Sequence, residues 1–256
     1  MTTHRTLRIA AAQSCSVPGD IAGNLQTHLR FITAARQAGA ELLLFPELSL
    51  SGYEPAMVRH CLLEPHNDQL APIKDLAREA SMAIVVGAPL TSHVADKPFI
   101  GAISFYPDGS HGVYRKQHLH PGEEGFATPG PVDSSNPNGY MLGDTAAALA
   151  ICADSMHPPH TQRAAVAGAA LYLASSLVSV GGFDGDARQL QQYAHQFNVG
   201  VLLANHGGPT GGYASAGKSS FWAPGGQLVV AAPGTGDLLL LATREAGLWS
   251  GALQPV

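Results

Sequence analysis

The sequence has few charged residues. Only 13% of its 256 residues are Asp, Glu, Lys or Arg, about half of the roughly 25% found in a typical soluble domain. The basic residues are dispersed, and the longest basic run is the pair Arg115 and Lys116. Binding to nucleic acid needs a concentrated basic surface that displaces counterions, so we expect no nucleic-acid partner. The net charge of −5 agrees with this expectation.

Long hydrophobic runs and paired cysteines are missing as well. The longest apolar runs, such as 146–151 and 238–242, are far shorter than the ~20 residues that span a bilayer, so we expect no membrane partner. The N-terminal residues lead into a short strand-like run and not into the apolar core of a signal peptide. The three cysteines, Cys15, Cys61 and Cys152, are an odd number, which fits free thiols in a reducing compartment. We therefore expect a cytoplasmic protein.

Short apolar runs alternate with stretches of helical periodicity, and each half of the chain predicts the order strand, helix, strand, helix, strand and hairpin. Because no linker divides the halves, we expect a single domain over residues 1–256. Its fold class is α/β, a four-layer α-β-β-α sandwich with helices outside two sheets. The expected strands are 7–12, 41–45, 83–87, 146–151, 171–174, 199–204 and 237–244, the helices 21–38, 68–80, 159–168 and 187–197, and the hairpins 99–118 and 219–232.

Three reactive side chains stand at the ends of predicted strands, where open α/β sheets bind ligands. Glu47 follows the run Leu-Leu-Leu-Phe-Pro, Lys116 ends a hairpin strand, and Cys152 ends the strand 146–151. Taken singly, they fit a loop carboxylate, a solvated strand end and a buried thiol. Taken together, a carboxylate can accept the thiol proton and return it to a leaving amine, while a lysine stabilises an oxyanion.

Three strings of residues carry a resemblance to a known family. Phe-Pro-Glu-Leu-Ser-Leu-Ser-Gly-Tyr (45–53), Tyr-Arg-Lys-Gln-His-Leu (114–119) and Ile-Cys-Ala-Asp (151–154) resemble, in order and spacing, the three motifs of the nitrilase superfamily of carbon–nitrogen hydrolases. The resemblance runs from about Leu7 to the C-terminus. It implies that Glu47 is the general base and acid, Cys152 the nucleophile and Lys116 the group that stabilises the oxyanion.

The same resemblance implies two supporting groups. The backbone N–H of Ala153 would be the second donor to the oxyanion. Members of the family also tend to have a further glutamate after the lysine, seven residues before a glycine. Glu123 stands seven residues before Gly130, and the adjacent Glu124 is the alternative.

The chain departs from the family pattern after the cysteine. Many members continue there with Arg-Phe-Pro-Glu, whereas this chain reads Cys-Ala-Asp-Ser-Met-His-Pro-Pro (152–159). The substrate of a particular subfamily is therefore not transferred. The candidates for substrate binding are Tyr53, Asp154, His157, Ser175 and Ser176, although the two serines fit helix or turn capping equally well.

Two other patterns predict no function. Residues 212–219 satisfy the phosphate-loop pattern Gly-x₄-Gly-Lys-Ser, but Phe-Trp-Ala-Pro-Gly-Gly follows where that motif needs a helix, so we expect a hairpin. The twelve histidines show no tight metal spacing, and Pro121 follows the alternating pair His118 and His120 directly. His157 and His160 are the other possible ligands of such a site. Because these histidines lack tight metal spacing, we expect no metal, and we also expect no cofactor.

The sequence thus predicts hydrolysis of a small carboxamide through a thioester at Cys152, with release of ammonia. A nitrilase or an N-carbamoyl amide hydrolase acting through the same three residues is the alternative. A second alternative is a member of the fold that binds a ligand and catalyses nothing. The resemblance also implies a homodimer or a larger homo-oligomer.

Overall fold

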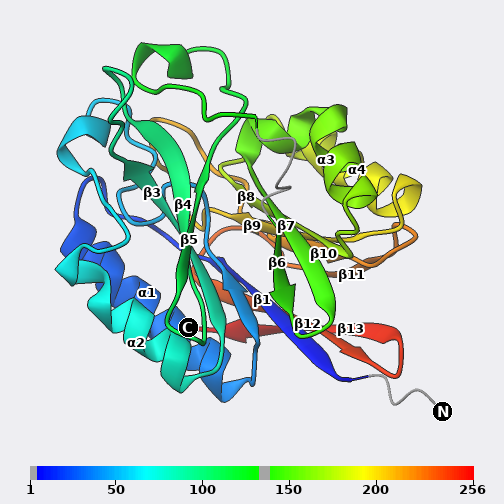
Figure 1. Ribbon diagram of the computed structural model, residues 1–256. Coiled ribbons are helices and arrows are strands. Elements are labelled where there is room, and N and C mark those ends of the chain that lie inside the picture. Colours follow the sequence, from blue (N-terminus) through cyan, green and yellow to red (C-terminus); the bar gives the residue numbers. More distant parts are fainter. Residues whose placement is uncertain (1–4, 133–138) are drawn as a thin grey trace.

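Two β-sheets organise the computed structural model, which describes residues 5–132 and 139–256 (Figure 1). The first sheet has seven strands in the order β13-β12-β1-β2-β3-β4-β5. Strands β1, β2 and β3 are parallel, and the other neighbours are antiparallel. The strands are β1 (Leu7–Gln13), β2 (Leu42–Leu44), β3 (Ala83–Leu90), β4 (Phe99–Phe105), β5 (His111–Arg115), β12 (Leu238–Glu245) and β13 (Leu248–Pro255).

The second sheet has six strands in the order β11-β10-β9-β8-β7-β6. Its centre is the parallel set β7, β8 and β9, with antiparallel strands on either side. The strands are β6 (Gly139–Leu142), β7 (Thr145–Ile151), β8 (Leu171–Ser176), β9 (Gly200–Asn205), β10 (Ser220–Trp222) and β11 (Leu228–Ala231).

Helices cover the outer face of each sheet, which confirms the predicted four layers (Figure 1). Helices α1 (Ile21–Gln37) and α2 (Ala71–Glu79) share one apolar cluster with the first sheet, and α3 (Pro158–Val166) and α4 (Phe183–Gln196) share another with the second. A third cluster contains buried residues of both sheets and fills the space between them. Each helix buries one apolar stripe, and the central strands of each sheet, such as β2, β3, β8 and β9, are buried on both faces.

The first helix forms for the reasons that its sequence predicts. The side chain of Asp20 accepts a hydrogen bond from the backbone N–H of Gly23, which caps the N-terminus of α1. Leu25, Ile32 and other apolar residues recur at helical spacing and are buried against the first sheet.

Three features differ from the sequence-based expectation. Strands β6 and β13 were not expected, because neither run alternates apolar with polar residues; most side chains of the edge strand β13 are exposed. Helix α4 begins at Phe183, four residues earlier than predicted. The N-cap residue Gly182 and Gly185 in the first turn lower the helical propensity of this stretch, so the sequence alone favours a later start. The glycine of the predicted strand end, Gly87, lies inside β3, which continues to Leu90.

The expectation for the glycine-rich loop is confirmed. The glycine-rich loop 212–219 enters strand β10 and the hairpin with β11, so no helix follows it.

In the described ranges 5–132 and 139–256, no helix is both long and apolar enough to cross a membrane.

Candidate active site

The three reactive residues predicted from strand ends lie beside one another. Glu47 follows β2, Lys116 directly follows β5, and Cys152 directly follows β7 of the other sheet. The Glu47 and Lys116 side chains are both fully buried, and Lys116 Nζ lies 2.6 Å from Glu47 Oε1. Packing of the two sheets against each other therefore brings a carboxylate, an ammonium and a thiol to one place.

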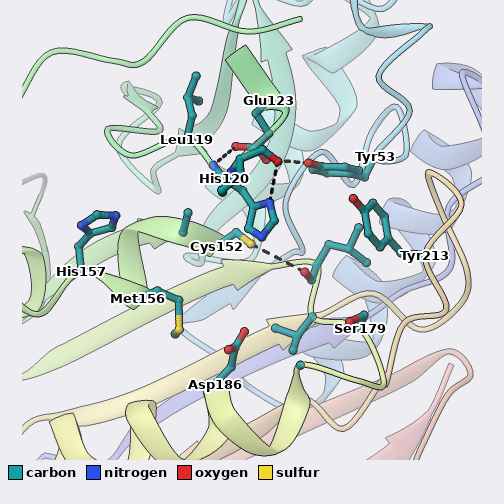
Figure 2. A pocket seen from close by; sticks show the side chains of 15 residues that line it. Tyr53, Leu119, His120, Glu123, Cys152, Met156, His157, Ser179, Asp186 and Tyr213 are labelled. Carbon is teal, nitrogen blue, oxygen red and sulfur yellow. Dashed lines mark hydrogen bonds between the residues drawn. The ribbon is translucent and has the colours of Figure 1, made fainter. Parts of the chain in front are cut away.

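A second carboxylate completes the surroundings of the ammonium. Lys116 Nζ lies 2.7 Å from Glu123 Oε1, which also accepts a 2.7 Å hydrogen bond from the Tyr53 hydroxyl. The other oxygen, Glu123 Oε2, accepts the backbone N–H of His120 at 2.7 Å (Figure 2). Of the two glutamates proposed for this place, the structure puts Glu123 against Lys116, whereas Glu124 is exposed.

The Glu47 carboxyl group is only half satisfied. Its Oε1 atom accepts from Lys116, and its Oε2 atom has no hydrogen-bond partner of normal geometry among the described residues, although the Cys152 thiol is close enough to act on the carboxyl group as a donor. Burial raises the pKa of Glu47 to about 7, and the negative charge of Glu123 adds to this, although Lys116 acts in the opposite direction. A carboxyl with a pKa near neutrality and one free oxygen is suited to accept and return a proton.

The neighbouring groups keep their protons in the absence of a substrate. Burial raises the pKa of the Cys152 thiol well above its ordinary value, and the charge of Glu47 raises it further, while Lys116 lowers it. Burial alone would lower the pKa of Lys116, but the charges of Glu47, Cys152 and Glu123 raise it above its ordinary value. The thiol is therefore neutral and the lysine positively charged at neutral pH.

Cys152 occupies a tight turn between strand and helix. Its φ of 44° lies in the left-handed region, which a residue with a Cβ rarely adopts. The turn begins the short helix Cys152–Met156, and the Sγ atom lies 3.8 Å from the carbonyl oxygen of Leu177. This conformation presents the thiol and the adjacent Ala153 to the pocket beyond the end of β7.

The backbone of Glu47 is held by two residues that were not predicted. His206 is fully buried, and its Nε2 atom lies 2.7 Å from the carbonyl oxygen of Glu47. Burial lowers the pKa of His206 to about 4, so the ring is neutral and Nε2–H donates. Gly87 lies beneath the same turn, where a Cβ would stand 2.3 Å from the oxygen of Pro46 and 2.4 Å from the nitrogen of Leu48.

Replacing Gly87 by alanine is expected to displace Glu47. The added methyl group would force the turn away from β3, and a shift of about 1 Å at a catalytic group can lower kcat about 100-fold. Initial rates on an amide substrate, with urea unfolding to measure stability, test this expectation. Gly234→Ala is the matched control, because nothing lies within 4 Å of that position. Equal losses in the two variants would contradict the role of the close approach.

The site opens into a pocket of about 320 Å³, a size that suits a small molecule. Figure 2 shows Cys152 at its centre, with Glu123, His120 and Tyr53 on one side and Asp186 on the opposite side. The residues that line it are Tyr53, Leu119, His120, Pro121, Glu123, Cys152, Ala153, Met156, His157, Leu177, Val178, Ser179, Gly182, Asp186 and Tyr213.

Of the five residues predicted to bind substrate, Tyr53 and His157 line this pocket, and Asp154, Ser175 and Ser176 do not. Ser175 is buried at the end of β8, where its hydroxyl donates to the carbonyl oxygen of Phe45 at 2.8 Å. Ser176 is the last residue of the same strand and is also buried. The hydrogen bond from Ser175 links the second sheet to the segment that carries Glu47.

Asp154 joins the lysine-bearing segment to the cysteine-bearing turn. Its side chain accepts hydrogen bonds from the Tyr114 hydroxyl at 2.5 Å and from the backbone N–H groups of Gln117 and His118. It also accepts the backbone N–H of Ile151 at 3.2 Å, within its own turn. Asp154 is fully buried, so these contacts fix the position of Lys116 relative to Cys152 without exposing the carboxylate to the pocket.

The histidines near the site pack against one another. The rings of His118 and His157 stack with centroids 4.0 Å apart, and His118 Nδ1 lies 2.9 Å from Asp154 Oδ1. His160 is buried against Tyr114 and Tyr172. Within the described part of the chain, no group of three or more His, Cys, Asp or Glu side chains is arranged to hold a metal ion.

The chain resembles several proteins in sequence. It is 29% identical over 254 residues to a protein from Pseudomonas protegens named as a hydrolase in the pqqF 5′ region, covering 95% of this chain and 85% of that one. It is 28% identical to the glutamine-dependent NAD(+) synthetase of Mycobacterium tuberculosis, covering 88% of this chain. The match spans only 37% of the length of the synthetase.

Solved structures of an amidase from Nesterenkonia sp. are similar throughout. A variant of that amidase without its cysteine, in complex with butyramide, matches with a TM-score of 0.84 and 27% identity, covering 94% of this chain and 92% of that one. Another of its structures, with a TM-score of 0.82 and 27% identity, shows acrylamide added at the active-site cysteine and covers 92% of each chain.

The family model for carbon–nitrogen hydrolases matches residues 8–251, which is nearly the whole chain. This match, the layered fold and the similarity to amidases agree with one another. The chain belongs to the carbon–nitrogen hydrolase family, whose fold is that of the nitrilase superfamily, and it is a hydrolase that acts on C–N bonds.

Proposed function

We propose that the protein hydrolyses a small carboxamide through a thioester on Cys152. The observation that carries this proposal is the buried contact of Lys116 with both Glu47 and Glu123, directly behind a thiol that lines a pocket. A buried ammonium between two carboxylates is costly unless its charge is used or fully paired. The similar amidase that binds butyramide supports a small amide as the substrate.

The first half of the reaction forms the thioester. The free Oε2 atom of Glu47 accepts the proton of the Cys152 thiol as the sulfur attacks the amide carbon, and a C–S bond forms. The carbonyl oxygen becomes an oxyanion. When this intermediate collapses, the C–N bond breaks, Glu47 returns the proton to the nitrogen, and ammonia leaves.

Lys116 supplies charge where the oxyanion develops. Its ammonium carries three N–H donors, and two of them face Glu47 and Glu123. The third is available for the oxyanion, and the backbone N–H of Ala153 is the second donor. Loss of one such donor typically lowers kcat about 10²- to 10³-fold.

The second half of the reaction releases the acid. A water molecule gives a proton to Glu47 as its oxygen attacks the thioester carbon. The C–S bond then breaks, and the sulfur takes the proton back from Glu47. The same carboxyl therefore acts as a base and as an acid in both halves, which requires a pKa close to the working pH, as burial provides here.

A panel of substrates tests the proposal. Release of ammonia is measured from matched carboxamides, nitriles and N-carbamoyl compounds, and hydrolysis of carboxamides is the expected result. Turnover of nitriles or N-carbamoyl compounds without turnover of carboxamides would instead support a nitrilase or an N-carbamoyl amide hydrolase. Binding without any turnover would support a member that only binds a ligand.

The activity is expected to fall as the pH drops below about 7. The base is the deprotonated form of Glu47, and burial raises its pKa to about 7, so protonation in this range removes the base. A profile of kcat/KM from about pH 5 to about pH 9 measures this acid limb. The isosteric variant Glu47→Gln is the control, and its residual rate should lack the limb. An acid limb near pH 4.5, the ordinary pKa of a glutamate, would contradict the effect of burial.

A further inference from the structure

The pocket has an excess of negative charge. Its lining includes the carboxyl groups of Glu123 and Asp186, and among the described residues that line it there is no lysine or arginine. The Lys116 ammonium lies behind the lining, where it already contacts Glu47 and Glu123. Two carboxyl groups therefore share the Lys116 ammonium at the catalytic end, and the Asp186 carboxyl of the lining has no such counter-charge among the described residues.

Asp186 lies away from that catalytic end. It belongs to the first turn of α4, and Figure 2 shows it across the pocket from Glu123 and His120, with its carboxyl group toward the interior. No hydrogen bond or ion pair joins its side chain to any residue in the ranges 5–132 and 139–256. Partial burial raises its pKa, and the nearby His120 only lowers it in part. An acceptor in a pocket without its own partner is available to a ligand.

Of the two histidines of the pocket, only His120 acts on this carboxylate, where a positive charge on its ring lowers the pKa of Asp186. The Nδ1 atom of His120 lies 3.1 Å from the carbonyl oxygen of Pro121. Partial burial lowers the pKa of His157, with the neighbouring His118 acting in the same direction, so its ring is neutral at neutral pH. In the described part of the chain, neither histidine forms a hydrogen bond or ion pair with Asp186, so its carboxyl group keeps its acceptor capacity.

We propose that Asp186 selects amides that carry a cationic amino group remote from the carboxamide. In this arrangement the carboxamide lies against Cys152, and the substrate ammonium donates to the Asp186 carboxylate across the pocket. A charge-assisted hydrogen bond of this kind is stronger than a neutral one and fixes the orientation of the substrate. The inference rests on the proposed amidase function and names its substrate class.

The same charges disfavour anionic substrates. A substrate carboxylate would lie near Asp186 and Glu123 with no free lysine or arginine in the lining. Like charges brought together in a partly desolvated pocket repel each other. Monoamides of dicarboxylic acids and N-carbamoyl amino acids are therefore expected to be poor substrates.

A matched series of substrates tests the preference. Unbranched ω-amino amides, neutral alkyl amides and monoamides of dicarboxylic acids of equal length are compared by kcat/KM. For the best chain length, we expect the cationic amide to exceed the neutral one about tenfold, in keeping with a hydrogen bond to a charged group. The Asp186→Asn variant is expected to lose this ratio, and Asp184→Asn is expected to keep it, since Asp184 is exposed and outside the lining.

Thiol labelling provides a readout that needs no amidase activity. The rates at which aminoethyl and sulfonatoethyl methanethiosulfonate modify Cys152 are compared by peptide mapping, which separates it from Cys15 and Cys61. We expect the cationic reagent to react faster and Asp186→Asn to reduce the ratio at least fivefold, as the loss of a close charge pair predicts. A ratio unchanged by Asp186→Asn, or a preference for anions, would overturn the inference. If no amide is hydrolysed but the cationic reagent still labels Cys152 faster and Asp186→Asn still reduces the labelling ratio, only the proposed function is overturned.

Discussion

The Cys152→Ala variant is expected to lose about 10⁴- to 10⁶-fold in kcat, the scale of loss seen when a covalent nucleophile is removed. In the proposed mechanism, the sulfur forms the only covalent bond between the protein and the substrate. Without it, Glu47 and Lys116 could only promote direct attack by water on the bound amide. Release of ammonia under saturating substrate measures the loss.

The same variant separates chemistry from binding. Alanine keeps a Cβ at the strained φ of 44°, so the turn is expected to hold and the substrate to bind. Intact-protein mass spectrometry during turnover is expected to show an acyl adduct on the wild type and none on Cys152→Ala. The matched control is Cys15→Ala, because Cys15 is an exposed thiol outside the pocket. Retention of a hundredth or more of the wild-type kcat by Cys152→Ala would exclude the thioester.

The sequence predicts the site where its signals are local. Glu47 and Cys152 lie at the ends of apolar strand-like runs and Lys116 at the end of a hairpin strand, and such patterns are visible in a single stretch of residues. Parallel strands bring their carboxyl ends to one edge, so side chains that follow them converge. The resemblance of three motifs to one family adds the expected roles.

The supporting residues depend on contacts between distant segments. His206 reaches the carbonyl oxygen of Glu47 across 159 positions in the chain, and no local pattern announces this bond. Gly87 offered a weak signal, because a glycine inside a strand often marks a close backbone approach. That signal was lost when the strand was predicted to end at Gly87, whereas β3 continues to Leu90.

The far side of the pocket was missed for a related reason. Asp186 lies in the part of α4 that precedes the predicted helix 187–197, where Gly182 and Gly185 weaken the helical pattern. Extending the helix to Phe183 places Asp186 in its first turn, facing the same pocket as Cys152. Helical propensity alone therefore predicts a start that is too late, because it does not include the tertiary packing that allows the helix to begin at Phe183.

Lys116→Met is expected to have the largest effect on stability, about 3–5 kcal/mol, because it leaves two buried carboxyl groups without their counter-charge. Glu47 and Glu123 both contact Nζ, and each would then repel the other across the gap that the ammonium filled. Activity would be lost together with the oxyanion donor. Urea unfolding, followed by the fluorescence of Trp222 and Trp249, measures the free energy of unfolding.

The effect of pH and of neutral substitutions reveals the cause of that loss. Without the ammonium, the pKa of Glu47 rises further above its unfolded value, so the folded protein takes up a proton before the unfolded chain does. The stability deficit relative to the wild type is therefore expected to shrink as the pH is lowered from about 8 to about 5. Adding Glu47→Gln and Glu123→Gln to Lys116→Met removes both charges with little change of shape, and is expected to recover most of the stability and none of the activity. A deficit that persists in this triple variant would show that the lysine stabilises the fold through packing of its alkyl chain, and not through its charge.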